Sequence, residues 1–481
     1  MPILAQPHIE WIVLSGEIRA LDWSPDGKYL AVGVWFELFG QLALFDYKGN
    51  LIWVNGTNLG LIRKVVFSPN GEHIAVLHST EGESILTIYS MDGEVECSCT
   101  AFEFSWCSDS DHFVVSINNQ LRLLKLSDLG FSRTYILDKD IETMEFSPSD
   151  YLAVGCEGRL MLYRLIGSNL NIEWGLHLSS NVKKIYWCSS SEFVIGTDTG
   201  VVSKHTITSS TPEWNVTVPG LVSDLKVNPS GTYIAVATYI ATEWGHIEVR
   251  LCSDSSRILY YTWSGVHSRS VEWNPDGDLL AVFWSSISSD HGEVRVYSVL
   301  PFETVWNYPT YGSVKMKWNP NTHRPCFAIG VDSHPPRLTV LSTSGNVVWS
   351  YRLLPHSAIY AEWDRTGHKV MVGDVYHVTA YNCRGMSLWL REVSNVFELL
   401  LYSGSDRIMA VGRWSVEAMY IVSGRKYYRK TFTHYIRDAA TCLTQPYLVV
   451  GAEDEVYLYK IDVSPFSLKW SKSLSDVRCV D

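Results

Sequence analysis

The sequence predicts an all-β protein built from about eleven copies of one four-stranded sheet, and three observations support this. An aromatic or apolar residue followed by a tight turn recurs roughly every 40 residues along the 481-residue chain. Short runs of alternating or β-branched residues surround each turn, as in strands. Tryptophans also recur at one place late in the repeat.

The clearest copy of the repeat begins at Ser270 and reads SVEWNPDGDLLAVFWSSISSDHGEVRVY. In the turn Asn274–Gly277, proline sets φ and glycine is free to adopt a positive φ. The four predicted strands are Ser270–Trp273, Leu279–Trp284, Glu293–Tyr297 and Phe302–Tyr308. One sheet of this size cannot bury both of its faces, so it needs neighbouring copies, as a blade of a β-propeller does.

The other copies are located by the bulky residue that ends the first predicted strand, here called the anchor. The anchors are Trp23, Phe67, Trp106, Phe146, Trp187, Val227, Trp273, Trp318 and Trp363, with weaker matches near Tyr402 and Leu443. Turns such as SPDG at Ser24–Gly27 and NPSG at Asn228–Gly231 follow them. The spacing predicts eleven units.

A second series of tryptophans occupies one position of the fourth predicted strand. Its members are Trp11, Trp53, Trp174, Trp214, Trp263, Trp306, Trp349, Trp389 and Trp470. Because aromatic side chains bury a large area per residue, we expect each of these rings to dock its blade onto the next.

The turn of Ser or Asn, Pro, Asp or Asn, and Gly, followed by a strand like Leu-Ala-Val-Gly, resembles the WD-repeat propellers. The resemblance extends over nearly the whole chain. It is incomplete, because the Gly-His pair that opens many WD repeats is absent and the closing Trp-Asp pair is replaced by Phe45-Asp46. The Gly-x-x-x-Trp spacing instead resembles quinoprotein-type propellers, although their cofactor residues have no counterpart here. The resemblance implies a divergent WD-like propeller.

Eleven blades exceed the four to eight that are typical of one ring, so two linked propellers are favoured over one oversized ring. The turns weaken through the third to fifth units and become regular again at Asn228–Gly231, after a Val218–Gly220 junction. We therefore predict a first propeller over residues 1–220, with about five repeats, and a second over 221–481, with about six. A break near Ser264–Gly265 is an alternative. The strand-like segment His8–Gly16 is expected to complete a late blade and help to close a ring.

Composition narrows the range of functions. The net charge of −12 argues against nucleic acid as the main partner, since a polyanion requires a basic surface. The basic and aromatic run Arg425–Lys430 is more simply a solvated strand edge. No apolar run is long enough for a membrane helix, and the first 16 residues lack the features of a signal peptide. We expect a cytoplasmic protein without membrane contact.

Ten cysteines without a secretory signal indicate free thiols in a reducing compartment. Cys97, Cys99 and Cys107 lie close together, but their spacing lacks the paired knuckles of a structural zinc site. The expected role of these cysteines is packing, and no metal or cofactor is predicted.

Candidate binding residues come from the loops between the second and third strands, because propeller strands are committed to packing and sites lie on the loops. The proposed partner-binding residues are Trp35, Phe36, Phe39, Tyr239, Glu243, Trp244, Trp284, His291 and Trp414, with Glu37, His246 and Asp290 as further polar neighbours. Aromatic residues are enriched at binding hot spots. The alternative is that these rings fold inward and pack between loops.

The sequence lacks a nucleophile elbow, a Walker loop and a His-Glu-x-x-His motif. His246 and His291, in matching loops of adjacent repeats, are the one pair that merits testing as metal ligands or as acid and base groups. We predict a non-catalytic scaffold that binds one or more proteins and can serve as a subunit of a larger complex. The alternatives are a small-ligand or sugar-binding propeller, or an enzyme with its site at the central channel.

Overall fold

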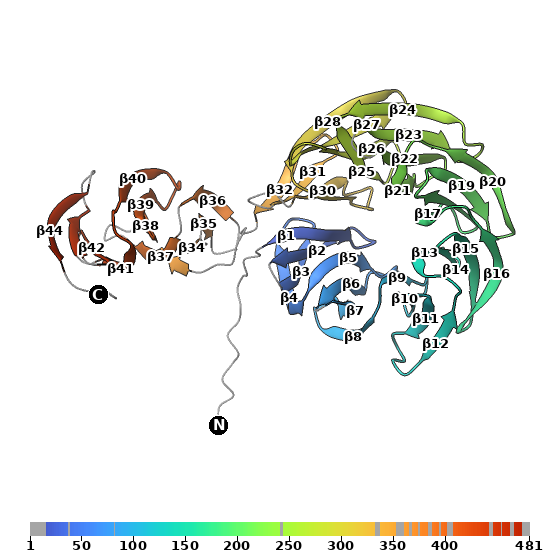
Figure 1. Ribbon diagram of the computed structural model, residues 1–481, viewed down its shortest axis with the longest axis horizontal. Coiled ribbons are helices and arrows are strands. Elements are labelled where there is room, and N and C mark those ends of the chain that lie inside the picture. Colours follow the sequence, from blue (N-terminus) through green and yellow to red (C-terminus); the bar gives the residue numbers. More distant parts are fainter. Residues whose placement is uncertain are drawn as a thin grey trace. The chain divides into compact units, whose positions relative to one another are not determined.

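The structure is a computed structural model, drawn in Figure 1. It describes residues 16–473 except 37–38, 81, 241–243, 332–336, 353–359, 365–367, 374–375, 383–386, 394–395, 402–406, 442–445, 454 and 462–465. Three predicted features therefore lie outside the described residues, apart from Gly16: the strand-like segment His8–Gly16 and the weaker anchors Tyr402 and Leu443.

The described residues form eleven antiparallel sheets, each made of four strands that are consecutive in the chain. We number the sheets as blades 1 to 11 in chain order. Blades 1 to 4 contain β1 Glu17–Trp23, β2 Tyr29–Phe36, β3 Phe39–Asp46, β4 Leu51–Leu59, β5 Leu61–Phe67, β6 His73–Thr80, β7 Glu83–Ser90, β8 Val95–Thr100, β9 Glu103–Trp106, β10 His112–Ile117, β11 Gln120–Lys125, β12 Ser132–Ile136, β13 Ile141–Phe146, β14 Tyr151–Cys156, β15 Arg159–Ile166 and β16 Asn169–His177. Blades 5 to 8 contain β17 Val182–Trp187, β18 Glu192–Thr197, β19 Val201–Thr206, β20 Ser209–Thr217, β21 Leu221–Val227, β22 Tyr233–Ile240, β23 Trp244–Leu251, β24 Arg257–Ser264, β25 Val266–Trp273, β26 Leu279–Ser286, β27 His291–Val299, β28 Phe302–Tyr311, β29 Val314–Trp318, β30 Cys326–Val331, β31 Arg337–Ser342 and β32 Val347–Arg352. Blades 9 to 11 contain β33 Tyr360–Trp363, β34 Lys369–Gly373, β35 His377–Asn382, β36 Ser387–Glu392, β37 Val396–Leu401, β38 Arg407–Gly412, β39 Ser415–Tyr420, β40 Lys426–Thr431, β41 Ile436–Thr441, β42 Tyr447–Ala452, β43 Glu455–Lys460 and β44 Ser467–Ser473.

The predicted all-β class and repeat number are confirmed for the described residues, which form eleven four-stranded blades. The first strands of blades 1 to 9 end at the nine predicted strong anchors. In the predicted turns, Gly27, Gly71, Gly231 and Gly277 have positive φ values between 64° and 75°, which is the conformation that glycine allows at low cost. The turn chemistry read from the sequence thus sets the first hairpin of several blades.

The chain divides into two compact units, and the first of them, Glu17–Ser350, holds blades 1 to 8. Figure 1 shows these eight sheets following one another around a ring. The predicted boundary at residue 220 lies inside this unit, where β17 and β21 of consecutive blades pack together. The structure therefore places the division at residues 350 and 351. The difference arises because the interface between blades 5 and 6 is the same kind of interface as the others, so a locally irregular turn does not interrupt the ring.

The ring is closed by contacts between blade 8 and blade 1, in which each sheet keeps its own four strands. Strand β1 packs against β29 and β30. The Trp23 indole donates to the carbonyl oxygen of Lys317 at 3.3 Å, and Trp349 donates to that of Tyr47 at 3.0 Å. The buried Asn319 amide also donates to the Gly27 carbonyl at 2.9 Å.

The predicted docking role is confirmed for six fourth-strand tryptophans, whereas Trp11 and the side chain of Trp470 lie outside the described residues. In four cases the indole N–H donates to a carbonyl in the β-hairpin of the following blade: Trp53 to Met91 at 2.8 Å, Trp174 to Ile207 at 3.2 Å, Trp214 to Cys252 at 3.0 Å and Trp306 to Thr343 at 2.7 Å. A Cβ added to Gly345 would lie 2.8 Å from the Trp306 ring. The turn glycine therefore also makes room for the ring of the preceding blade.

The second unit contains blades 9 to 11, whose described strands lie after Tyr351. Consecutive blades again pack through their first strands, β33 on β37 and β37 on β41. Trp389 repeats the docking contact, because its indole donates to the Ile421 carbonyl at 2.7 Å. The basic run Arg425–Lys430 lies mainly on the outer strand β40, where Lys426 pairs with the buried Glu417 at 2.6 Å.

Candidate functional site

The first strand of each blade is the innermost strand of the ring and lines its central channel. The anchors point into the core between blades, so the pleat turns the residue before each anchor to the opposite side. Asp22, Glu145, Lys226, Glu272 and Lys317 occupy this position in blades 1, 4, 6, 7 and 8. Charged side chains from much of the chain therefore meet along the channel.

These channel charges form a network between blades. Lys317 Nζ lies 3.7 Å from Asp22 and 3.9 Å from Glu272, and Lys226 Nζ lies 3.8 Å from the same Glu272 carboxylate. The Lys226 ammonium also lies 5.1 Å from the centre of the Tyr186 ring, within cation–π range. The Glu272 carboxylate raises the pKa of Lys317, against the effect of burial. Both lysines thus remain charged, and the middle of the channel is largely neutralised.

One end of the channel opens into a cavity of about 700 Å³. It lies at the edge where the loops between second and third strands emerge, because Ser289, Asp290 and His291 of blade 7 line it. Seven Lys and Arg side chains line this cavity against three carboxylates, those of Asp224, Glu272 and Asp290. The six other than Lys317, which pairs with Asp22 and Glu272, are called the cationic mouth: Arg19, Arg63, Lys64, Lys184, Arg269 and Lys315.

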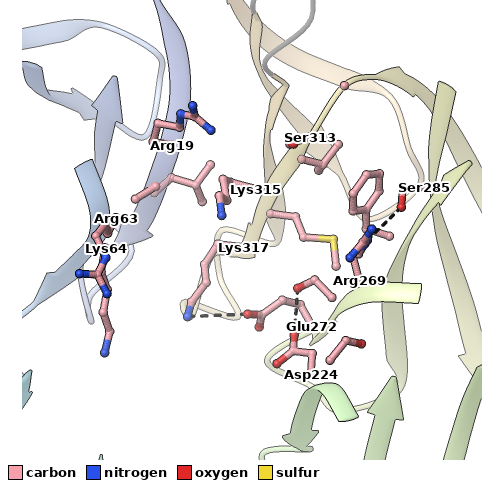
Figure 2. Close-up of a pocket in the computed structure, with 18 of the residues that line it drawn as sticks. Arg19, Arg63, Lys64, Asp224, Arg269, Glu272, Ser285, Ser313, Lys315 and Lys317 are labelled. Carbon is pink, nitrogen blue, oxygen red and sulfur yellow. Dashed lines mark hydrogen bonds and ion pairs between the residues drawn. The ribbon is translucent and has the colours of Figure 1, made fainter. Parts of the chain in front are cut away.

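Figure 2 shows the cationic mouth, with side chains converging on the cavity from strands on opposite sides. The contributing strands are β1, β5, β17, β25 and β29. A second cavity, of about 620 Å³, extends toward the opposite face, where Pro25 and Pro69 of the turns after the first strands line it. Its five Lys and Arg side chains are matched by five carboxylates. Arg63, Lys64 and Lys184 line both cavities, but only the first cavity has more cations than carboxylates.

Three of the predicted binding residues lie at the cationic mouth. The half-buried Trp35 ring packs under the guanidinium of Arg19, with the Cζ atom 5.1 Å from the ring centre. Tyr239 holds Arg269 in the same way at 5.1 Å. The His291 ring lines the cavity and contacts the Tyr311 ring at 4.7 Å between centres. In this structure the predicted aromatics support the cations.

Two more predicted residues are exposed at the outer rim of the same face. Phe39, at the start of β3, is 56% exposed, and Trp244, at the start of β23, is 43% exposed. Trp414 is also exposed, but it belongs to blade 10 in the other unit, where it contacts the Tyr435 ring at 5.4 Å. The predicted set is thus divided between the two units.

Trp284 does not lie on a binding rim, so its assignment as a binding residue is wrong. It lies within β26 and is 1% exposed. The Trp263 and Tyr261 rings meet it edge-on, each at 5.9 Å between centres. The inward-packing alternative therefore holds for this residue, because the fourth strand of blade 6 covers it. Glu37, Glu243 and the side chain of Phe36 lie outside the described residues.

The predicted histidine pair is not brought together as a site. His246 is buried in β23, where its Nε2 lies 3.1 Å from the Glu248 carboxylate and its ring contacts Tyr260. His291 contacts Ser289 and Tyr311 instead. Within the described residues, no three His, Cys, Asp or Glu side chains gather as a metal site. Cys97 and Cys99 pack against a buried apolar cluster, and burial raises the pKa of Cys99 to about 11.

Sequence reasoning missed the cationic mouth, although the repeat contained a signal for it. Three or four residues before the anchors, the sequence places Arg19, Arg63 and Lys64, Lys184, Arg269 and Lys315. Aligning the repeats on their anchors and reading these two columns would have shown the excess of positive charge. These columns lie within strands, whereas the predicted binding residues were taken from loops.

Comparisons with known proteins agree with this architecture. The family model described as "WD domain, G-beta repeat" matches residues 11–35. A crystal structure of a eukaryotic initiation factor is similar with a TM-score of 0.51 and 11% identity, covering 71% of this chain and 89% of that chain. The C-terminal WD40 domain of Sif2 has a TM-score of 0.39 and 16% identity, covering 65% of this chain and 93% of that chain. No curated protein sequence matches.

The family match covers a single repeat, and the initiation factor shares the fold at low identity. The repeated turns, anchors and docking tryptophans extend the same pattern over the other blades. The described part of the chain has no helix capable of crossing a bilayer. One repeat of the chain is thus similar in sequence to the WD repeat, and its described blades share the fold of the initiation factor.

Proposed function

We propose that this protein is a non-catalytic scaffold that binds a partner protein on the ring face bearing the loops between second and third strands. The observation that carries the proposal is the exposure of large aromatic side chains on this face of the ring, namely Phe39, Trp244 and Tyr311. They come from blades 1, 6 and 7 and lie at strand ends on this one face. Aromatic anchors bury much area with little loss of rotamer freedom, so they suit a protein interface.

The ionisable side chains of the channel support a non-catalytic role, because they form ion pairs with one another. In the described channel, the Asp22, Glu272, Lys226 and Lys317 side chains pair with one another across blade interfaces. The most buried histidine of the predicted pair, His246, is held by Glu248. These contacts stabilise the ring, and they account for these ionisable groups without a catalytic role.

We further propose a cytoplasmic location and membership of a larger complex. The seven cysteines of the described residues are free thiols, which fits a reducing compartment. Two units in one chain would offer two separate surfaces, since exposed aromatics occur in both, as Trp244 and Trp414.

The test compares capture of partner proteins by the full chain and by a Phe39→Ala/Trp244→Ala double variant, using chemical cross-linking in cells and quantitative mass spectrometry. We expect the double variant to lose at least one protein that the wild type captures. Ile172→Ala is the matched control, because Ile172 is an exposed apolar residue on the outer strand β16. Identical protein sets from wild type and double variant would contradict the proposal.

A sugar-binding function is the alternative that the exposed rings favour, since tryptophan also stacks on pyranose faces. A glycan array separates the two possibilities. Binding of a glycan that is lost in Trp244→Ala, with unchanged protein capture, would support the sugar ligand and reject the protein interface.

A further inference from the structure

The cationic mouth differs in charge from the rest of the protein. The whole chain has a net charge of −12, yet seven Lys and Arg side chains line the cavity against three carboxylates. Like charges repel one another, so concentrating them in one cavity lowers the stability of the fold. An excess that is kept at this cost points to a role in binding. This contrast is the starting point of the inference.

Carboxylates neutralise several cations of the cavity, because Lys64 pairs with Glu103 and Lys184 lies 4.0 Å from Asp224. Lys317 has two acidic neighbours, Asp22 and Glu272. In contrast, Arg63 donates to the Ser84 hydroxyl at 3.1 Å and to the Phe102 carbonyl at 3.4 Å. Arg269 donates to the Ser285 hydroxyl at 3.2 Å. Both exposed arginines therefore have neutral hydrogen-bond partners and retain their full charge toward the cavity.

The arginines of the mouth are also held in place before any ligand arrives. Arg19 packs over the Trp35 ring and pairs with Glu17 at 3.1 Å. Arg269 packs over the Tyr239 ring while its Nε binds Ser285. Holding a planar guanidinium by its face leaves its edge for bidentate contact with an oxyanion. Less side-chain entropy is then lost on binding.

We propose that the cationic mouth binds a short peptide segment with clustered oxyanions, either carboxylates or phosphates, on the partner protein. The inference rests on the proposed scaffold function and specifies the chemistry of its partner. A cavity of about 700 Å³ accommodates a few side chains. The exposed aromatics around it would contact the apolar residues that flank the charged segment.

A nucleic acid fits this arrangement less well. Binding of a long polyanion uses a basic stripe that follows the backbone. Here only one cavity has an excess of cations, and the second cavity, which shares Arg63, Lys64 and Lys184 with it, has equal numbers of cations and carboxylates. A short anionic segment that ends within the mouth matches this distribution.

The test measures fluorescence anisotropy with the full-length chain and three labelled peptides of equal length. One peptide carries four glutamates, the second has four phosphoserines at the same positions, and the third has four glutamines. We expect at least one anionic peptide to bind at least tenfold more tightly than the glutamine peptide. Its binding should weaken as salt concentration rises. The better of the two anionic peptides identifies the source of the oxyanions.

The variant Arg63→Gln/Arg269→Gln should weaken the binding of that peptide about ten- to a hundredfold, since hydrogen bonds between charged groups are stronger than neutral ones. The matched control is Arg133→Gln/Arg164→Gln. These two exposed arginines lie on β12 and β15 over the Phe131 and Tyr151 rings, so the control removes the same charge and the ring contact that Arg269 makes. A thermal melt of each variant confirms folding.

Three results would overturn the inference: equal binding of all three peptides, an equal loss in the control variant, or tighter binding of tripolyphosphate or a single-stranded oligonucleotide than of either anionic peptide. The scaffold proposal fails separately. If the Phe39→Ala/Trp244→Ala variant loses its partner while no peptide binds the mouth, the scaffold stands and only the anionic ligand is rejected.

Discussion

The two units of this protein contain the same blade but use it differently. In Glu17–Ser350, each blade packs on the next and blade 8 returns to blade 1 through Trp23, Asn319 and Trp349. In the unit after Tyr351, the described packing runs from blade 9 to 10 and from 10 to 11. The comparison shows that docking to a neighbour belongs to the repeat, whereas closure belongs to a particular set of eight blades.

The largest effect is expected from removing the closing tryptophan. Trp349→Ala deletes a ring that packs on Phe45 at 5.9 Å and would lie 2.6 Å from a Cβ added to Gly49. Loss of a large aromatic side chain costs about 3–5 kcal/mol of unfolding free energy. Chemical denaturation measures this cost, and hydrogen exchange should show faster opening in blades 1 and 8.

Trp389→Ala is the counterpart in the second unit, because Trp389 makes the same indole hydrogen bond to the next blade. We expect it to accelerate exchange in blades 9 and 10 and to leave blades 1 and 8 unchanged. If Trp349→Ala and Trp389→Ala gave the same exchange pattern, the assignment of Trp349 to ring closure would be wrong.

A smaller effect is expected from Asn319→Ala. The Asn319 side chain is fully buried and donates to the Gly27 carbonyl across the closing interface at 2.9 Å. Leaving a buried carbonyl without its donor costs about 1–3 kcal/mol. Asn228→Ala is the control, since Asn228 reaches the Gly277 carbonyl at a longer 3.4 Å between two other blades. A smaller loss for Asn319→Ala than for Asn228→Ala would argue against a special role in closure.

Each unit contains a glutamate whose stability contribution depends on pH. Burial raises the pKa of Glu145 in the ring to about 7, partly offset by Lys226 and other lysines. Burial, reinforced by Asp438, raises the pKa of Glu398 in the second unit to about 7. Because the folded pKa is above that of an unfolded glutamate, the favourable contribution is complete below about pH 4.5 and is lost as the pH rises through 7.

The glutamine variants test this dependence. We compare the unfolding free energy of each variant, Glu145→Gln and Glu398→Gln, with that of the wild type. This difference should be more favourable to the variant at pH 8 than at pH 5, by on the order of 1 kcal/mol. Salt should separate the two, because screening weakens the attraction of lysines for Glu145 and the repulsion of Asp438 for Glu398. NMR titration should show the pKa of Glu145 rising with salt and that of Glu398 falling. Parallel pH–stability curves for wild type and variants would reject the prediction.

The smallest stability effect is expected from Trp244→Ala. Trp244 is exposed, and surface substitutions usually change stability by less than about 0.5 kcal/mol. Trp284→Ala, in the adjacent blade, removes a fully buried ring and should cost about 3–5 kcal/mol. Denaturant midpoints of the two variants check the contrast. Equal losses would mean that Trp244 is committed to packing and is unsuited to a partner surface.

The sequence by itself determined the blade. The Pro and Gly turns, the anchors and the docking tryptophans are local or next-neighbour features, so they predicted eleven four-stranded sheets and the contact that joins one sheet to the next. They could not predict where a ring ends, because every interface between blades uses the same residues, whether it lies within a ring or closes it. The inferred division at residue 220 relied on a weaker turn, and the structure divides at residues 350 and 351.

Only the tertiary structure decided the candidate site. Arg19 and Lys315 are almost 300 residues apart in sequence, and they meet because blade 8 packs on blade 1. Trp284 lies in a second strand and is buried because Trp263 and Tyr261 of the neighbouring blade cover it, whereas Trp244 begins a third strand and is exposed. Burial and convergence depend on the relative placement of whole sheets, which follows from their packing around the ring. A residue's place in its own repeat does not contain that information.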